Sequence, residues 1–250
     1  MMASPAKAIT NGEPDNRRHP DVGLAVFDDA NGPSHRCSAS LLSPTVVLTA
    51  GHCTDGTVAA RVWFDEDVQN NSEYPFSGGT SYDGIPYTNP DFCIGCGNGL
   101  PGFPSATSAS SCSPSRSRPV WSASTPSSRR PAWSTSCPAR HGHAGRLRGA
   151  GADRRRRPAV WAGLRVRLMA PVRLISGSFT HSEEFVRVTA SPGQGGGTCF
   201  GDSGGPNFLG DSTVVAGITS FGVNGNCAGT GGVFRTDRKN VLDFIKSYLP

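Results

Sequence analysis

Two segments of the 250-residue chain hold residue types that suit acyl transfer. The first is GTCFGDSGGP, Gly197–Pro206, in which Ser203 lies between small residues on a tight turn. Such a turn presents a hydroxyl nucleophile and directs backbone N–H groups at one point, where an oxyanion would form. A glycine-rich turn alone is a weak signal, but the order Cys-x-Gly-Asp-Ser-Gly-Gly-Pro is long and particular.

The second segment is CSASLLSPTVVLTAGHC, Cys37–Cys53, which ends in a histidine beside a cysteine. A lone histidine is usually structural or merely exposed. Here His52 follows an apolar run typical of a buried strand, Thr45–Ala50, and a second cysteine lies 16 residues before Cys53. This placement marks His52 as the second candidate for chemistry.

Together the two segments resemble the chymotrypsin-like (trypsin-fold) serine proteases, and more narrowly their secreted bacterial and fungal members. The resemblance covers roughly residues 9–65 and 176–249. It implies that Ser203 is the nucleophile and that His52 is first the general base and then the general acid. It also implies an oxyanion hole made by the N–H groups of Gly201 and Ser203.

The resemblance extends to the start of the chain, where ITNG (Ile9–Gly12) is similar to the mature N-terminus of these proteases. It implies that cleavage after Ala8 frees an amine that pairs with Asp202 and locks the oxyanion loop. Ala6-Lys7-Ala8 has the small-x-small form of a signal-peptide cleavage site but no apolar core before it. We therefore expect the given sequence to begin inside a longer signal peptide.

The same resemblance implies two disulfides, Cys37–Cys53 and Cys199–Cys227, each holding a catalytic loop to its barrel. Ser220-Phe221-Gly222 resembles the strand edge that pairs with the substrate backbone.

The resemblance also suggests a preference for the residue before the cut bond (P1). Gly197 lies where trypsin-like members carry an aspartate, and Gly222 and Gly232 match the walls of the pocket. An uncharged, open pocket implies preference for an aromatic or large apolar side chain.

The family also requires an aspartate on a strand some tens of residues after His52, and no matching motif exists. Asp65, Asp83 and Asp91 lie in loop-like sequence, and Asp153 lies among arginines. None of them is assigned the role.

A compositional anomaly occupies the place where this aspartate belongs. Residues 104–173 hold 14 of the 21 arginines and only one acid, and 46 of the 70 residues are Ser, Arg, Pro or Ala. These types have GC-rich codons, and reading Ala106–Ser113 one base earlier gives Asp-Val-Gly-Val-Val-Val-Leu. We interpret the segment as a frameshifted translation, with the aspartate codon spanning Ala106 and Thr107. A low-complexity linker and a basic binding insert are the alternatives.

The segment also accounts for the net charge of +5, because the rest of the chain holds 10 basic and 18 acidic residues. The Arg154–Arg157 run could bind nucleic acid, heparin or acidic membranes, but basic runs are usually solvated, and we expect no nucleic-acid or membrane partner.

The pair Cys93–Cys96 resembles half a zinc site without a second half. We expect no metal and no cofactor, and the pairing of Cys93, Cys96, Cys112 and Cys137 stays open.

Apolar runs bounded by turn residues predict strands over Val22–Phe27, Ser38–Ser43, Thr45–Ala50, Ala59–Phe64, Phe185–Ala190 and Ser212–Gly222, and helical spacing predicts a helix over Asp237–Leu249. With the resemblance, this pattern predicts an all-β fold of two six-stranded antiparallel barrels and a C-terminal helix. The predicted parts are an incomplete first barrel over 9–103 that carries His52, an irregular anomalous segment over 104–173, and a second barrel with the helix over 174–250 that carries Ser203.

The predicted function is a secreted, extracellular, monomeric serine endopeptidase that hydrolyses protein or peptide substrates through an acyl-enzyme. The alternative is a catalytically impaired protease homologue that binds partners through its basic segment. A two-domain protein with a disordered basic linker is disfavoured, because each half holds only half of the catalytic residues.

Overall fold

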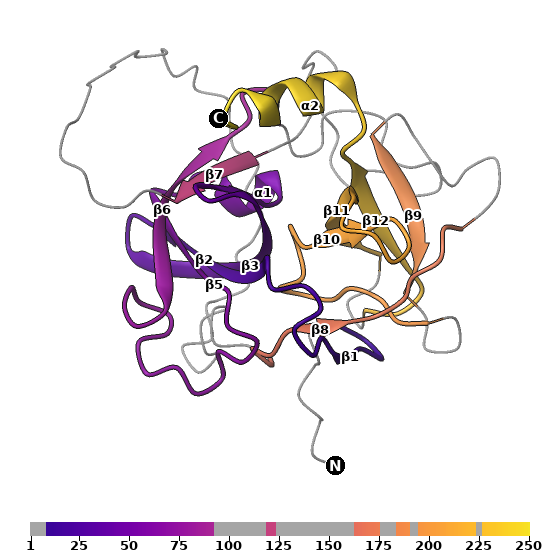
Figure 1. The fold of residues 1–250 in the computed structure, drawn as a ribbon, viewed down its shortest axis with the longest axis horizontal. Coiled ribbons are helices and arrows are strands. Elements are labelled where there is room, and N and C mark those ends of the chain that lie inside the picture. Colours follow the sequence, from indigo (N-terminus) through magenta and orange to yellow (C-terminus); the bar gives the residue numbers. More distant parts are fainter. Residues whose placement is uncertain (1–8, 93–118, 124–162, 176–183, 191–194, 224–226) are drawn as a thin grey trace, which may run out of the picture.

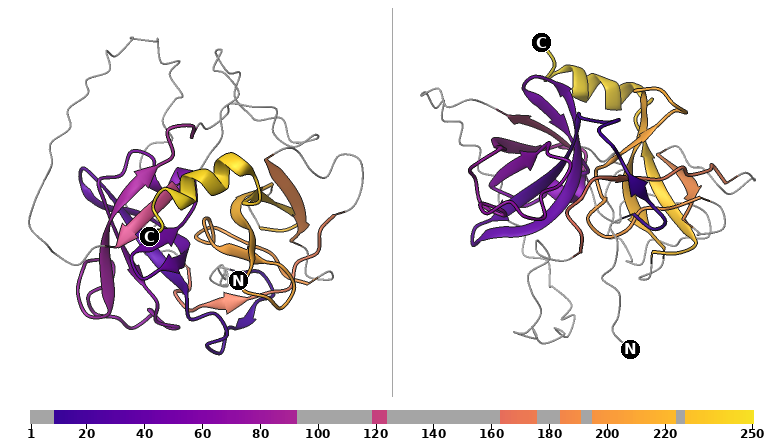
Figure 2. Two further views of the ribbon diagram at one scale, coloured as in Figure 1. Left: turned by 45° about the horizontal axis from the view of Figure 1, so that its top comes forward. Right: turned by 60° about the horizontal axis from the view of Figure 1, so that its bottom comes forward.

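The computed structural model describes residues 9–92, 119–123, 163–175, 184–190, 195–223 and 227–250. In it two β units lie side by side, with a helix across one end of both (Figures 1 and 2). Several features singled out in the sequence lie outside the described residues: Ala6–Ala8, Cys93, Cys96, Ala106, Thr107, Cys112, Cys137 and Arg154–Arg157.

The first unit is a closed six-stranded antiparallel barrel in the order β2-β3-β4-β7-β6-β5. Its strands are β2 (Val22–Asp29), β3 (Gly32–Ser43), β4 (Val46–Leu48), β5 (Ala59–Trp63), β6 (Ser81–Thr88) and β7 (Pro119–Ala123).

The expectation that this barrel is incomplete and ends at residue 103 is wrong. Strand β7 comes from the Arg-rich segment and pairs with β4 on one side and β6 on the other. The physical reason is that ladder hydrogen bonds need an extended backbone, not a particular side chain, and closure removes two exposed edges.

The second unit is a four-stranded antiparallel sheet in the order β10-β11-β12-β9. Its strands are β9 (Phe185–Thr189), β10 (Pro206–Phe208), β11 (Val215–Gly222) and β12 (Thr230–Arg235), and beside it β1 (Glu13–Pro14) pairs with β8 (Leu168–Met169).

The fold class is as predicted, but the described part of this unit is not a closed barrel of six strands. Leu174 joins this sheet through a single bridge to Val188, and Thr10 and Gly197 form a second single bridge outside it, so neither bridge adds a full strand to the described part of the unit.

One hydrophobic core connects both units and the C-terminal helix. The helix α2 (Lys239–Lys246) buries Val241 and Ile245, one turn apart, against Ile218 and Phe234 of the second sheet and the apolar interior of the first barrel. The predicted C-terminal helix is therefore present, over a shorter range. No helix in the described part of the chain is long and apolar enough to span a membrane.

Candidate active site

His52 lies on a single helical turn, α1 (Gly51–Thr54), that follows β4 after two buried residues. The disulfide Cys37–Cys53 ties this turn to β3. A ring nitrogen of His52 lies within 4.8 Å of both sulfur atoms of the disulfide. Barrel strands on both sides therefore fix the position of the half-buried imidazole.

The loop bearing Ser203 packs directly on the strands that position His52. The N–H of Ser38 on β3 donates to the carbonyl of Ser203 at 2.8 Å, and Cys53 Sγ lies 4.0 Å from the same oxygen. Gly204 has φ +81°, and a Cβ there would lie 2.1 Å from Thr49 Oγ1, so only glycine fits this junction. The close packing brings the two predicted catalytic segments together.

The backbone N–H groups around Ser203 differ in whether they have an acceptor. The N–H groups of Asp202, Gly204 and Gly205 donate to backbone carbonyls at 2.8–3.1 Å. Within the described structure those of Gly201 and Ser203 have no acceptor. Gly201 has φ +98°, a conformation that favours glycine. The two free donors are those that an oxyanion hole requires.

The electrostatic environment of His52 favours the neutral imidazole. Burial lowers the pKa of His52, and the nearby His35 lowers it further. His35 itself is fixed by contacts of its two ring nitrogens, Nε2 with the Cys53 carbonyl at 3.0 Å and Nδ1 with Ser34 Oγ at 2.8 Å. A neutral imidazole is the form that accepts a proton.

Among the described residues His52 has no carboxylate partner and no hydrogen bond to Ser203. Asp65 accepts a hydrogen bond from Thr80, and Asp83 accepts one from Ser77. Asp65 and Asp83 are thus engaged elsewhere on the barrel, and Asp83 lies on β6 and not in a loop as expected from the sequence.

The barrel shows where a carboxylate could reach His52. The start of β7 pairs with the end of β4, Val120 opposite Leu48, four positions before His52 in the chain. A strand in this slot that began with an aspartate would bring its carboxylate near the imidazole. Residues 104–118, which precede β7, include no acid.

The buried carboxylate of Asp202 stabilises the loop that bears Ser203. Its Oδ2 accepts the Cys199 N–H at 2.7 Å, and Cys199 is also held by its disulfide to Cys227. Burial raises the pKa of Asp202 to about 7, although the Cys199 N–H and the charge of Arg36 oppose this rise. Arg36 lies against the loop, because a Cβ on Gly201 would be 3.1 Å from its Nε.

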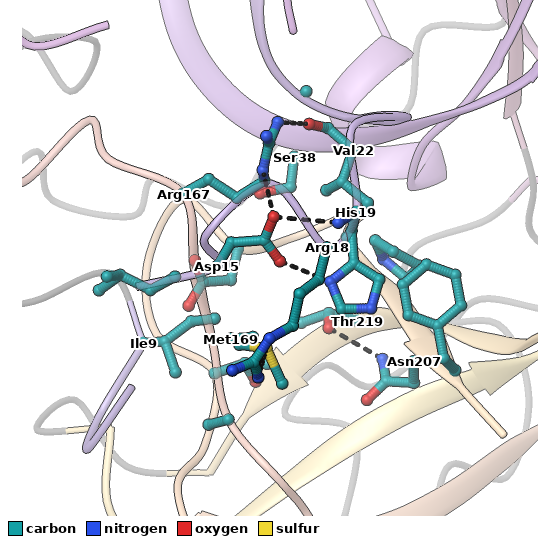
Figure 3. A pocket seen from close by; sticks show the side chains of 18 of the residues that line it. Ile9, Asp15, Arg18, His19, Val22, Ser38, Arg167, Met169, Asn207 and Thr219 are labelled. Atoms are coloured by element: carbon teal, nitrogen blue, oxygen red, sulfur yellow. Dashed lines mark hydrogen bonds and ion pairs between the residues drawn. The ribbon is translucent and has the colours of Figure 1, made fainter. Parts of the chain in front are cut away.

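A cavity of about 580 Å³ lies next to Asp202 and is lined by Ile9, Arg36 and Asp202 among others (Figure 3). Neither His52 nor Ser203 lines it. The cavity is therefore not the reaction centre, but it places Ile9 in the same space as Asp202.

The residues predicted to shape the specificity pocket differ in their surroundings. Gly222 borders open space, whereas the ring of Phe221 covers Gly232, 2.2 Å from where a Cβ would be. Gly231 is the residue that pairs with Gly222 and faces Thr198 Oγ1, 3.4 Å from its Cβ position. Gly231, the first glycine of the Thr230-Gly231-Gly232 run, is not among the pocket residues predicted from the sequence, and this run is the only local signal for it.

Gly197 is buried and lines the cavity next to Asp202. Its N–H and C=O both bond to Thr10, and a Cβ would lie 2.3 Å from the Ala190 Cα. Replacing it with aspartate is therefore expected to destabilise the fold, by roughly 1–3 kcal/mol of overpacking, instead of creating cleavage after Lys or Arg.

Thermal unfolding and a peptide panel check this prediction for Gly197→Asp. Gly222→Ala is the matched control, since no atom lies within 4 Å of its Cβ position, and it should unfold like the parent chain. A Gly197→Asp chain with unchanged stability and new cleavage after Lys or Arg would contradict it.

One group of side chains in the described residues has the composition of a metal site, namely Cys37, His52 and Cys53. The two sulfur atoms are bonded to each other, so they offer no thiolates, and His52 alone does not make a metal centre.

Comparison with known proteins places these features in a family. The family model for trypsin matches residues 9–84 and 121–245, and the unmatched 85–120 contain the place where the aspartate is missing. Among solved structures, HL collagenase has a TM-score of 0.52 at 16% identity, covering 98% of this chain and 97% of its own. A mutant of human heparin binding protein has a TM-score of 0.54 at 12% identity, covering 98% of each chain.

At these identities the two solved structures show the shared fold alone. No curated protein sequence matches significantly. The family model covers most of the chain, and its matched ranges include both segments that the sequence analysis singled out, Cys37–Cys53 and Gly197–Pro206. The chain belongs to the trypsin family of chymotrypsin-like serine-protease folds.

Proposed function

We propose that the chain is a serine endopeptidase that cleaves peptide bonds through an acyl-enzyme on Ser203. The observation that carries the proposal is the pair of unpartnered N–H groups on Gly201 and Ser203, in a loop where the N–H groups of Cys199, Asp202, Gly204 and Gly205 are bonded. Donors held in place without a partner are suited to a charge that forms only during the reaction.

In the proposed reaction Ser203 Oγ attacks the substrate carbonyl while His52 accepts the hydroxyl proton. The carbonyl oxygen becomes an oxyanion that accepts hydrogen bonds from the Gly201 and Ser203 N–H groups. His52 then returns the proton to the leaving amine, and water hydrolyses the ester by the reverse sequence. A carboxylate behind His52 would stabilise its charged form, so this chain is expected to turn over slowly.

Substrate binding is proposed along the end of β11. Along this strand the β10 register ends at Ile218, backbone hydrogen bonds to Gly204 and Gly205 continue to Thr219, and Gly222 pairs with Gly231 of β12. Ser220 lies at the bulge between the paired residues. Ser220 and Gly222 at this strand end support main-chain pairing with an extended peptide, and the glycines at 222 and 231 support a P1 residue with an aromatic or large apolar side chain.

The proposal includes a secreted, monomeric enzyme that acts on proteins or peptides. The two disulfides, Cys37–Cys53 and Cys199–Cys227, support an oxidising compartment. Activation is proposed to involve cleavage after Ala8, because Ile9 lines the same cavity as Asp202.

A second candidate is an impaired homologue that acts as a binding protein through its basic segment. The observation that favours it is the lack of a carboxylate partner for His52 in the described part of the chain.

Fluorophosphonate labelling separates the two candidates. The parent chain should be labelled slowly at Ser203, and Ser203→Ala should abolish labelling. Where a full triad exists, losing the serine costs about 2 × 10⁶ in turnover and losing the aspartate alone about 3 × 10⁴. This chain already lacks the aspartate. Ser203→Ala is therefore expected to lower its peptide hydrolysis by about 10²-fold relative to the parent chain.

Ser212→Ala is the matched control, since Ser212 is exposed and bonds only within its own turn. It should leave the labelling rate unchanged. A folded parent chain that takes up no label at Ser203 would reject the endopeptidase proposal in favour of the binding protein.

A further inference from the structure

Asp15 is a buried carboxylate that the proposed reaction does not use. It is 1% exposed. One of its oxygens lies 2.5 Å from His19 Nδ1, and the other accepts the His19 N–H and Arg167 Nε, each at 3.0 Å (Figure 3). Burial raises the pKa of Asp15, but the bonds to His19 and Arg167 outweigh burial and lower it overall. The carboxylate is therefore ionised and fully engaged.

This cluster connects three parts of the chain that are distant in sequence. Arg167, from the segment that joins the two units, also donates to the carbonyls of Val22 at 2.7 Å and Phe64 at 3.2 Å in the first barrel. The ring of His19 stacks on Phe208 of the second sheet, with centroids 4.8 Å apart. A buried charge pair with this many partners fixes orientation as well as contact.

A short backbone path leads from the cluster to the catalytic loop. Strand β1 ends immediately before Asp15, and it pairs with β8, which begins immediately after Arg167. Before β1, Thr10 exchanges two backbone hydrogen bonds with Gly197, at 2.8 and 3.1 Å, and adds a third from its hydroxyl at 3.2 Å. Gly197 opens the segment that leads to Ser203.

The cluster and the catalytic loop also share the same cavity. Asp15, His19 and Arg167 line one part of it, and Ile9 and Asp202 line another. A shift of the N-terminal segment would therefore change both the bridge at Thr10 and the space beside Asp202.

We propose that Asp15, His19 and Arg167 are positioning residues that hold the N-terminal segment in register with the loop bearing Ser203. The effect on turnover rests on the proposed function, but the effect on backbone order does not. A merely structural ion pair would stabilise the fold as a whole, whereas a positioning cluster acts selectively on residues 9–15 and 195–203.

Hydrogen exchange of the full chain, followed by mass spectrometry of its peptides, tests the proposal. Asp15→Asn should speed exchange by about tenfold or more in peptides that cover 9–15 and 195–203, and less in the β2–β5 strands. Arg235→Gln is the matched control, because it breaks an ion pair with Asp237 (2.6 Å) that is exposed and outside the cavity. It should leave both sets of peptides unchanged.

Unchanged exchange in 195–203 with faster exchange in 9–15 would overturn the proposal. If Asp15→Asn instead speeds exchange throughout the first barrel, the Arg167→Lys variant is used to test the proposal. Lysine keeps the positive charge but loses the guanidinium hydrogen bonds to the carbonyls of Val22 and Phe64. The variant should still speed exchange selectively in the two peptide sets, and a uniform or absent change would overturn the proposal.

Turnover gives an independent readout of the same variants. Since the cluster contacts no proposed substrate residue, Asp15→Asn should lower kcat and leave KM unchanged. A parent chain without any activity would reject the proposed function, while the exchange result would still decide the role of the cluster.

Discussion

Restoring the reading frame over the part of the Arg-rich segment that precedes Arg167 is expected to raise turnover by about 10⁴-fold, the amount that the triad aspartate contributes in the well-studied case. The proposed frame reads Asp-Val-Gly-Val-Val-Val-Leu across Ala106–Ser113. A strand of this sequence suits the slot between β4 and β6 that Pro119–Ala123 fills in the structure. Its leading aspartate would then lie near His52, because this end of the slot faces Leu48.

The coding DNA and the corrected chain provide the measurement. Turnover of an apolar peptide substrate is compared among the parent chain, the corrected chain and a corrected chain with asparagine in place of the restored aspartate. The asparagine chain should lose the increase in turnover, because asparagine keeps the shape of the side chain but removes its negative charge. Coding DNA in which no frame reads Asp-Val-Gly at this place would reject the frameshift hypothesis.

Removal of residues 1–8 is expected to raise turnover by roughly 10²–10³-fold, the contribution of a well-placed oxyanion donor. The new amine of Ile9 would enter the cavity shared with Asp202 and pair with its carboxylate. That pair would hold the N–H groups of Gly201 and Ser203 in place.

The pH dependence of stability provides a second measure of the pairing between the Ile9 amine and Asp202. In the unprocessed chain burial raises the pKa of Asp202 to about 7, above the ordinary value of 3.8 for an aspartate. Between these values the folded state keeps a proton that the unfolded state has lost, so stability falls as pH rises. Asp15 has a lowered pKa and loses its stabilising effect only as pH falls through the acidic range below 3.8. The two effects therefore occupy different pH ranges.

Thermal unfolding at pH 5 and pH 8 checks this prediction. The unprocessed chain should lose stability between the two, and the processed chain should lose less, because a cationic amine favours the Asp202 carboxylate. Asp202→Asn should remove the difference between the two chains. Equal pH profiles for processed and unprocessed parent chains would contradict the pairing.

Local patterns account for the parts of the site that the sequence could predict. The Gly-Asp-Ser-Gly-Gly turn owes its shape to glycines at Gly201 and Gly204 that take left-handed φ values. His52 follows a strand whose residues are all buried, and α2 buries its i, i+4 pair. In each case the residues that determine the geometry are neighbours in the chain, so their spacing and type were enough to predict the local structure.

The sequence by itself therefore determined the two candidate segments around His52 and Ser203, the family and the C-terminal helix. Only the tertiary structure decided that β7 closes the first barrel, that Ala190 crowds Gly197, and that Arg167 neutralises the buried Asp15. These last two residues are 152 positions apart, and nothing in the spacing around either one specifies its partner. A buried charge must be neutralised, but which distant side chain does so depends on how the two β units pack together.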